Sequence, residues 1–156
     1  MNEVVELLKN KGKTISTMES CTGGAVASEI TDVEGSSEVL KFSAVTYSNE
    51  FKIKMGVDKS VIDKYSVYSI QTANEMSKKI SDFTNSDYAV GITGKINRED
   101  EKNKYGENNV VFISIYDRSK NIHYEYKLDV LDISRKENKE RIVDFISNEL
   151  KKIINL

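Results

Sequence analysis

Apolar and polar residues follow two periods along this chain, and each period predicts a different kind of element. Apolar residues at helical spacing, bounded by capping and stop residues, predict three longer helices over 2–11, 70–84 and 134–154. Similar but shorter patterns predict helices over 25–31, 49–55 and 59–65. Runs of β-branched and aromatic residues predict strands over 14–18, 39–47, 88–93, 109–117 and 121–129.

The order of these elements predicts an α/β fold. Helices alternate with the first three strands, and the last two strands form a hairpin around residues 117–121. We therefore expect an α/β layered domain with a mixed sheet. The chain has 156 residues and no repeat or linker, so residues 1–156 are expected to form a single domain.

Composition excludes several classes of protein. Lys and Arg number 23 against 25 Asp and Glu, so the basic surplus of a nucleic-acid-binding protein is missing. A single cysteine and a single histidine exclude an intramolecular disulfide, a cysteine-rich zinc site and any mechanism with two histidines. Residues 1–6 lack a signal-peptide pattern, and the longest strongly apolar run, 110–115, is far shorter than the ~20 residues of a membrane span. We expect a cytoplasmic protein with no membrane contact and no metal or other cofactor.

A turn between the first strand and the second helix is the strongest local sign of chemistry. It reads Ser20-Cys21-Thr22-Gly23-Gly24. Free backbone N–H groups at a helix start, with glycines that allow close approach, can serve a nucleophilic hydroxyl, an oxyanion hole or a phosphate. The same residues could instead be a helix-capping serine followed by a closely packed glycine pair.

A nucleophilic serine needs a base, and a lysine can provide it. Ser20 and Tyr47 both lie at the carboxyl ends of predicted strands, and Lys52 lies shortly after Tyr47. Because ligands gather at the carboxyl ends of parallel strands, these three side chains could form a cluster. His123 lies in the predicted hairpin and is the weaker candidate. Cys21 is a second possible nucleophile, although a small buried thiol is the commoner fate.

Two further segments could border the site. Thr93 and Gly94 end a predicted buried strand and could add backbone donors. Residues 94–108 are expected to be a charged loop. Its run 95–104 is expected to be solvated, with a lid or a partner surface as the alternative. Arg135, in the first turn of the last helix, could reach a phosphate.

Several blocks of the sequence resemble the CinA C-terminal domain family, whose members include the PncC nicotinamide-nucleotide amidases. Residues 14–24 (TISTMESCTGG) are similar to the family signature. Residues 31–37 (TDVEGSS) are similar to "TDVPGSS" and residues 45–52 (VTYSNEFK) to "VTYSNEAK". Residues 87–94 (DYAVGITG) resemble the strand "ADLAVAVTG". The resemblance extends over essentially the whole chain and indicates a stand-alone form of this domain.

The resemblance implies an amidohydrolase that converts nicotinamide mononucleotide to nicotinic acid mononucleotide and ammonia. It also implies that the mixed sheet lies in a three-layer α/β/α sandwich, in a domain that is often dimeric. In bacteria this reaction recycles a by-product of NAD-consuming DNA ligation. By the same resemblance Ser20 is the nucleophile, Lys52 the base and Tyr47 their support, with no metal. Oxyanion or substrate-binding roles are expected for Cys21, Thr22, Gly23, Gly24, Asn49, Thr93, Gly94 and Arg135. The expected partners are a pyridine nucleotide and further copies of the same chain, in a homodimer or higher homo-oligomer.

The sequence departs from the family in one loop. Where members carry a glycine- and proline-rich segment such as "TGIAGPGGG", residues 93–100 read TGKINRED. In the family this loop is expected to border the substrate. Two alternatives therefore stay open: a catalytically lost domain that binds a nucleotide or a protein partner, and an amidase of the same mechanism for another small amide.

Overall fold

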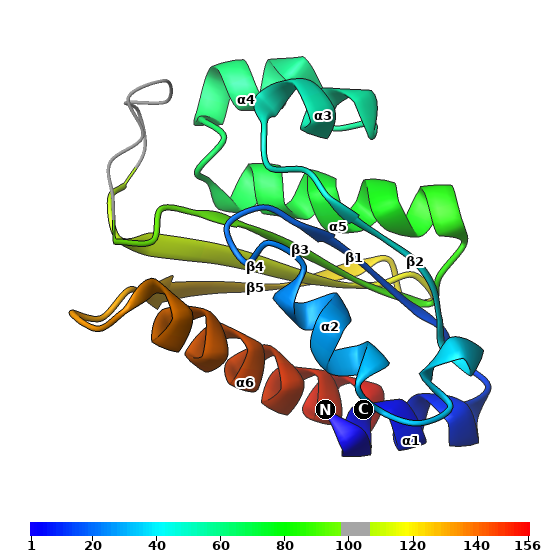
Figure 1. Cartoon of the computed structure of the whole chain (residues 1–156). Helices are drawn as coiled ribbons and strands as arrows, with labels where there is room; N and C mark the ends of the chain where they lie inside the picture. Colours follow the sequence, from blue (N-terminus) through cyan, green and yellow to red (C-terminus); the bar gives the residue numbers. More distant parts are fainter. Residues whose placement is uncertain (98–106) are drawn as a thin grey trace.

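Five strands form one mixed sheet in the order β2-β1-β3-β4-β5 (Figure 1). The computed structural model describes residues 1–97 and 107–156. The strands are β1 (Ile15–Glu19), β2 (Leu40–Val45), β3 (Tyr88–Gly94), β4 (Val110–Asp117) and β5 (Ile122–Asp129). β1 pairs in parallel with β2 and β3, whereas β3, β4 and β5 pair antiparallel. The mixed sheet that the element order predicts is therefore confirmed.

Helices cover both faces of the sheet, as Figure 1 shows. One face carries α1 (Asn2–Lys11), α2 (Ala25–Thr31) and α6 (Arg135–Ile154), and the larger apolar core lies beneath them. The other face carries α5 (Ile70–Thr84) over a smaller core, with α3 (Asn49–Lys54) and α4 (Lys59–Tyr65) on the same side. A single 3-10 turn, η1 (Ser36–Glu38), precedes β2 in the described chain. These layers confirm the predicted three-layer α/β/α sandwich.

Helix boundaries agree closely with the sequence predictions because capping residues mark them. Ser69 accepts from the backbone N–H of Thr72 at the start of α5. Ser134 and Glu137 form a reciprocal capping box at the start of α6. The predicted strand over 39–47 is too long, since β2 begins at Leu40 and ends at Val45.

The expectation of a solvated run over 95–104 is wrong for its first residues. Lys95 and Ile96 are only 4% and 2% exposed. Lys95 Nζ donates to Asn108 Oδ1 at 2.9 Å. The Asn97 side chain donates to the carbonyl of Ile133 just before α6. Residues 98–106 lie outside the described part of the chain, and the prediction for them stays a prediction.

Helix α5 lies unusually close to the centre of β3. A Cβ atom added at Gly91 would lie 2.3 Å from the carbonyl oxygen of Ala73 and 2.6 Å from the amide nitrogen of Ser77. Only glycine permits this approach of two backbones. The contact fixes α5 against the strand whose carboxyl end borders the candidate site.

Candidate active site

The carboxyl ends of three parallel strands meet at one edge of the sheet. Glu19 at the end of β1 is in register with Val45 of β2 and Ile92 of β3. The backbone N–H of Ser20 donates to the Ile92 carbonyl at 3.0 Å, and that of Thr46 donates to the Glu19 carbonyl at 2.8 Å. The residues that follow all three strands are thereby held side by side, as expected for a ligand site in such a sheet.

Ser20 and Lys52 form a buried pair at this edge. Lys52 Nζ lies 2.9 Å from Ser20 Oγ, and the two residues are 2% and 7% exposed respectively. Lys52 Nζ also donates to the carbonyl of Thr46 at 2.6 Å. Ser48 caps the start of α3 by accepting from the N–H of Phe51, which sets the direction of the helix that carries Lys52. The structure thus brings together the serine and lysine that the sequence singled out.

The turn after Ser20 contains two glycines with left-handed backbone. Gly23 and Gly24 have φ of 63° and 95°, values that favour glycine. The N–H of Gly23 donates to the Ser20 carbonyl, whereas the N–H groups of Cys21, Thr22 and Gly24 donate to no backbone carbonyl in the described chain. Those N–H groups are candidate donors for an oxyanion. The alternative of a helix-capping serine is wrong. The N-cap residue of α2 is Gly24, which has no side chain with which to accept a capping hydrogen bond.

Glu19 is a buried site residue that the sequence reasoning missed. Its carboxylate accepts from the Thr22 hydroxyl at 2.7 Å and from the N–H groups of Val26 and Ala27 at 3.0 and 2.9 Å. The first turn of α2 is therefore already occupied by an anion from the same chain. This argues against a phosphate at the start of α2, which was one of the three uses expected for that helix start. The available signal was an acidic residue placed directly before Ser20.

Cys21 is buried, as the sequence reasoning expected for a small thiol. Burial raises the pKa of Cys21 to about 12, and the nearby charge of Lys52 offsets this only in part. A thiol with such a pKa stays protonated at neutral pH and is a poor nucleophile. The geometry therefore favours Ser20 over Cys21.

The structure does not bring Tyr47 to the pair. Its side chain is 66% exposed, and within the described residues no hydrogen bond joins it to Ser20 or Lys52. Asn49 lies three residues before Lys52, as the first residue of α3, and is half-buried. The site therefore consists of the Ser20–Lys52 pair, with Asn49 on the same helix as the lysine.

His123 lies away from the candidate site. It is paired with Tyr116 in the β4–β5 ladder, near the end of the sheet opposite Ser20. Its Nδ1 lies 3.0 Å from Ser114 Oγ and 3.3 Å from Ser77 Oγ. Burial lowers the pKa of His123, which favours its neutral form in this hydroxyl cluster. A role as base for Ser20 is excluded by its position.

Thr93 and Gly94 serve the fold at this edge. The buried Thr93 hydroxyl donates to the carbonyl of Val67 at 2.9 Å, in the segment that leads to α5. Gly94 pairs with Val111, and a Cβ added there would lie 2.5 Å from the Val110 carbonyl oxygen. Both residues lie at the end of β3 that borders the site. The Thr93 hydroxyl is already bonded within the protein, and the position of Gly94 has no room for a larger side chain.

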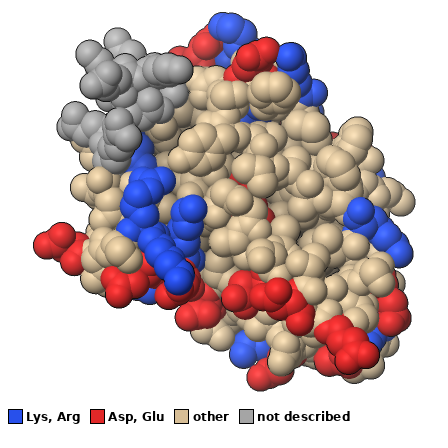
Figure 2. Space-filling view, viewed as in Figure 1, with Lys and Arg blue, Asp and Glu red and all other residues tan. Residues whose placement is uncertain are grey.

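Two cations from the start of α6 flank the Ser20 turn. Arg135 donates to the carbonyl of Ile96 and is close enough to Cys21 to influence its pKa. Lys139, which the sequence reasoning did not single out, places its Nζ 3.5 Å from where a Cβ on Gly23 would lie. Figure 2 shows Lys and Arg side chains in a stripe on this face, near the start of α6. This arrangement can attract an anionic substrate.

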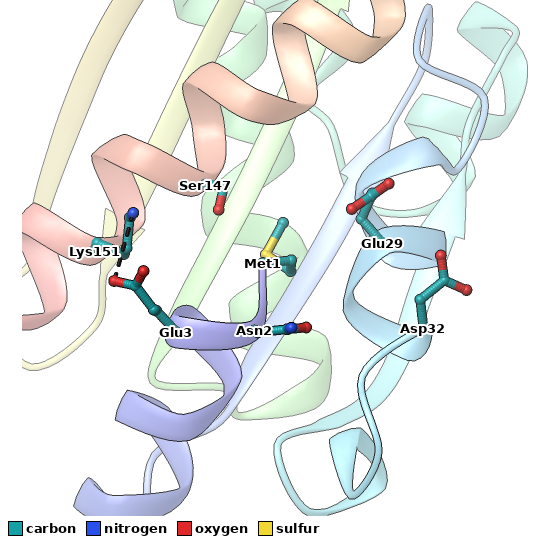
Figure 3. Close-up of a pocket in the computed structure, with 7 residues that line it drawn as sticks. All are labelled: Met1, Asn2, Glu3, Glu29, Asp32, Ser147 and Lys151. Atoms are coloured by element: carbon teal, nitrogen blue, oxygen red, sulfur yellow. Dashed lines mark ion pairs between the residues drawn. The ribbon is translucent and has the colours of Figure 1, made fainter.

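A cleft of about 310 Å³ lies elsewhere, among α1, α2 and α6 (Figure 3). Its charged lining is mainly acidic, with Glu3, Glu29 and Asp32 beside Lys151, which pairs with Glu3 at 3.6 Å. Glu29 lies near the carboxyl end of α2 and Asp32 just beyond it, whereas Ser20 precedes the start of that helix. The cleft is therefore separate from the Ser20–Lys52 pair.

Metal-ligating side chains do not gather at either place: across the described ranges, no three His, Cys, Asp or Glu side chains are grouped so that they could hold a metal ion. None of the helices in that part of the chain combines the length and hydropathy that crossing a lipid bilayer requires.

Comparisons with known proteins give a consistent result. A family model described as the CinA C-terminal domain matches residues 1–154. A protein named CinA-like protein from Shewanella pealeana is 42% identical over 104 residues, which are 64% of this chain and 24% of that protein. This chain spans about a quarter or less of the length of the curated relatives that it matches, 22% and 24% in two cases.

Solved structures share the fold over nearly the whole chain. The competence/damage inducible protein CihA from Agrobacterium tumefaciens matches with a TM-score of 0.86 at 26% identity, over 99% of this chain and 92% of that one. A competence-damaged protein (CinA) superfamily protein from Klebsiella pneumoniae matches with a TM-score of 0.89 at 21% identity, over 99% and 94% of the two chains.

Proposed function

Because the chain belongs to the CinA C-terminal domain family, we propose that it is an amidohydrolase of the PncC type, which hydrolyses the carboxamide of nicotinamide mononucleotide. The observation that carries this proposal is the buried contact of 2.9 Å between Lys52 Nζ and Ser20 Oγ. A serine beside a lysine amine is a known nucleophile–base arrangement for acyl transfer. The products are nicotinic acid mononucleotide and ammonia.

The proposed reaction begins with proton transfer from Ser20 to Lys52. For this step the Lys52 amine has to be neutral, so that its lone pair can accept the Ser20 proton. Ser20 Oγ then attacks the amide carbon, and backbone N–H groups of the turn stabilise the oxyanion. Lys52 returns the proton to the leaving nitrogen, so that ammonia departs and an ester on Ser20 remains. Water then hydrolyses this ester, with Lys52 again taking the proton.

No step of this course requires Tyr47. The direct contact of Lys52 with Ser20 makes a relay through an exposed tyrosine unnecessary. The substrate phosphate is proposed to lie toward Arg135 and Lys139, because the start of α2 is filled by Glu19. These assignments are part of the proposal, together with a cytoplasmic location.

Ammonia release from nicotinamide mononucleotide tests the proposal. We expect the wild type to be active, and Ser20→Ala and Lys52→Ala to lose about 10³-fold or more in kcat/KM. Lys54→Ala is the matched control: Lys54 lies on the same helix but is exposed and paired with Glu50. It should stay within about twofold of the wild type.

Two results would count against this function. Full activity in Ser20→Ala would exclude the proposed nucleophile. Folded wild type that releases no ammonia would instead favour one of the two alternatives, a binding domain or an amidase for another small amide. A panel of small amides would then separate those two.

A further inference from the structure

A carboxylate with no exposure to solvent is unusual, and Glu19 is 0% exposed. Each of its oxygens accepts two hydrogen bonds. Oε1 accepts from the Thr22 hydroxyl and the Val26 N–H at 2.7 and 3.0 Å. Oε2 accepts from the Thr17 hydroxyl and the Ala27 N–H at 3.0 and 2.9 Å. Four donors offset the cost of removing this carboxylate from water.

These bonds tie together both ends of the Ser20 turn. Glu19 itself ends β1 immediately before the turn, Thr22 lies at its centre, and Val26 and Ala27 follow it in α2. α2 has Gly24 at its N-cap and receives no hydrogen bond from an N-cap side chain. Glu19 supplies the missing acceptor from outside the helix.

We propose that Glu19 is a positioning residue for the nucleophile. Its carboxylate occupies the positive end of α2 and holds the turn so that Ser20 Oγ and the backbone N–H groups of Cys21 and Thr22 face one reacting group. This rests on the proposed role of Ser20 as nucleophile but not on the identity of the amide. The same contact keeps a substrate anion off this helix start, so the charge of the substrate is recognised elsewhere.

Glu19→Gln tests the proposal with almost no change in volume. A Gln side chain can keep the bonds from Thr22 and Val26, but its NH2 group then meets the N–H of Ala27, so one bond to the helix is lost. We expect kcat to fall about 10- to 100-fold with KM within about threefold. Thr17→Val is the matched control, because it also removes one bond to the carboxylate, on the strand side. It should keep kcat within about threefold of the wild type.

A second readout uses the nucleophile without the nucleotide. An uncharged alkyl fluorophosphonate reacts as Ser20 Oγ bonds to phosphorus, fluoride leaves and Lys52 takes the proton. We expect the second-order rate of this reaction to fall at least about tenfold in Glu19→Gln and to stay near the wild-type value in Thr17→Val. If nicotinamide mononucleotide is not a substrate, this measurement still decides the role of Glu19.

A variant pair at Thr22 covers the case in which Glu19→Gln does not fold. Thr22→Val removes the hydroxyl that donates to Oε1, and Thr22→Ser keeps it. We expect Thr22→Val to lose fluorophosphonate reactivity and Thr22→Ser to restore it. Wild-type reactivity in Glu19→Gln or Thr22→Val would overturn the proposal. The proposal would also be overturned if Glu19→Gln and Thr17→Val lost equal reactivity, and if those losses only followed the stability of each variant in urea.

Discussion

The hydroxyl of Ser20 and the thiol of Cys21 belong to consecutive residues, and the fold places them in opposite environments. Ser20 Oγ meets the amine of Lys52, whereas Cys21 turns into the apolar core. Burial then raises the pKa of Cys21 to about 12. A difference of one position along the chain therefore separates a candidate nucleophile from an unreactive core residue.

The raised pKa of Cys21 predicts a specific dependence of stability on pH. Between about pH 9 and 12 the unfolded thiol loses its proton while the folded thiol keeps it, so the wild type loses stability as the pH rises. Cys21→Ala lacks this contribution. We expect the wild type to lose roughly 2 kcal/mol relative to Cys21→Ala between pH 7 and pH 10.5. Urea unfolding of both proteins measures this, and a constant difference would contradict the prediction.

At the scale of residues, sequence motifs could predict the serine and lysine but not their surroundings. Ser20 and Lys52 follow strands whose carboxyl ends have to meet, so their proximity follows from topology. The contacts of Glu19 and Lys139 depend on the direction of long side chains across the turn, which no local pattern specifies. Tyr47 follows β2 just as Thr46 does, yet it faces solvent.

Among the elements, the approach of α5 to β3 carries the clearest consequence. Gly91→Ala would push the helix backbone away from the strand, because the added methyl meets the Ala73 carbonyl. We expect a loss of about 2–4 kcal/mol in the free energy of unfolding. Gly12→Ala is the control: its added methyl meets nothing within 4 Å, and only its φ of 60° is unfavourable. It should cost about 1 kcal/mol in the same urea titration, and equal losses would contradict the argument.

The elements themselves were largely predictable because their ends carry explicit signals. Ser69 and Ser134 cap helices as their sequence context indicates. The segment after β3 was not predictable, since the charge of Lys95 suggested solvation. Its stem is buried, while its Nζ reaches Asn108 and lies 4.9 Å from the centre of the Tyr68 ring.

On the scale of the whole molecule, β2 and β5 are the two edge strands of the sheet, and exposed apolar side chains gather at the β2 edge. β2 has a partner only on its β1 side. Phe42 of β2 is 41% exposed and lies 5.3 Å, ring to ring, from Phe83 of α5, which is 66% exposed. Val45 and Phe51 add further exposed apolar surface. An unpaired edge with apolar flanks suits pairing with an identical edge about a twofold axis.

We propose that this edge joins two copies of the chain, in line with the homo-oligomer that the family resemblance implies. A double variant, Phe42→Asp with Phe83→Asp, should be monomeric where the wild type is dimeric in light scattering at about 50 μM. Ile122→Asp on β5 is the control, because Ile122 is 43% exposed on the opposite edge of the sheet. A wild-type monomer, or a double variant that stays dimeric, would contradict the proposal.

The meeting of three strand ends also makes the candidate nucleophile a reporter of folding order. Ser20 contacts Lys52, 32 residues away, and bonds to Ile92 through its backbone, so neither contact can form locally. Parallel pairing between distant segments is slow relative to helix formation. The chain contains no proline, so no prolyl isomerisation step of tens of seconds delays it. During refolding, we expect the reactivity of Ser20 towards the fluorophosphonate to return only when the parallel strands have paired. It should return in a single phase, and later than the helical signal in circular dichroism.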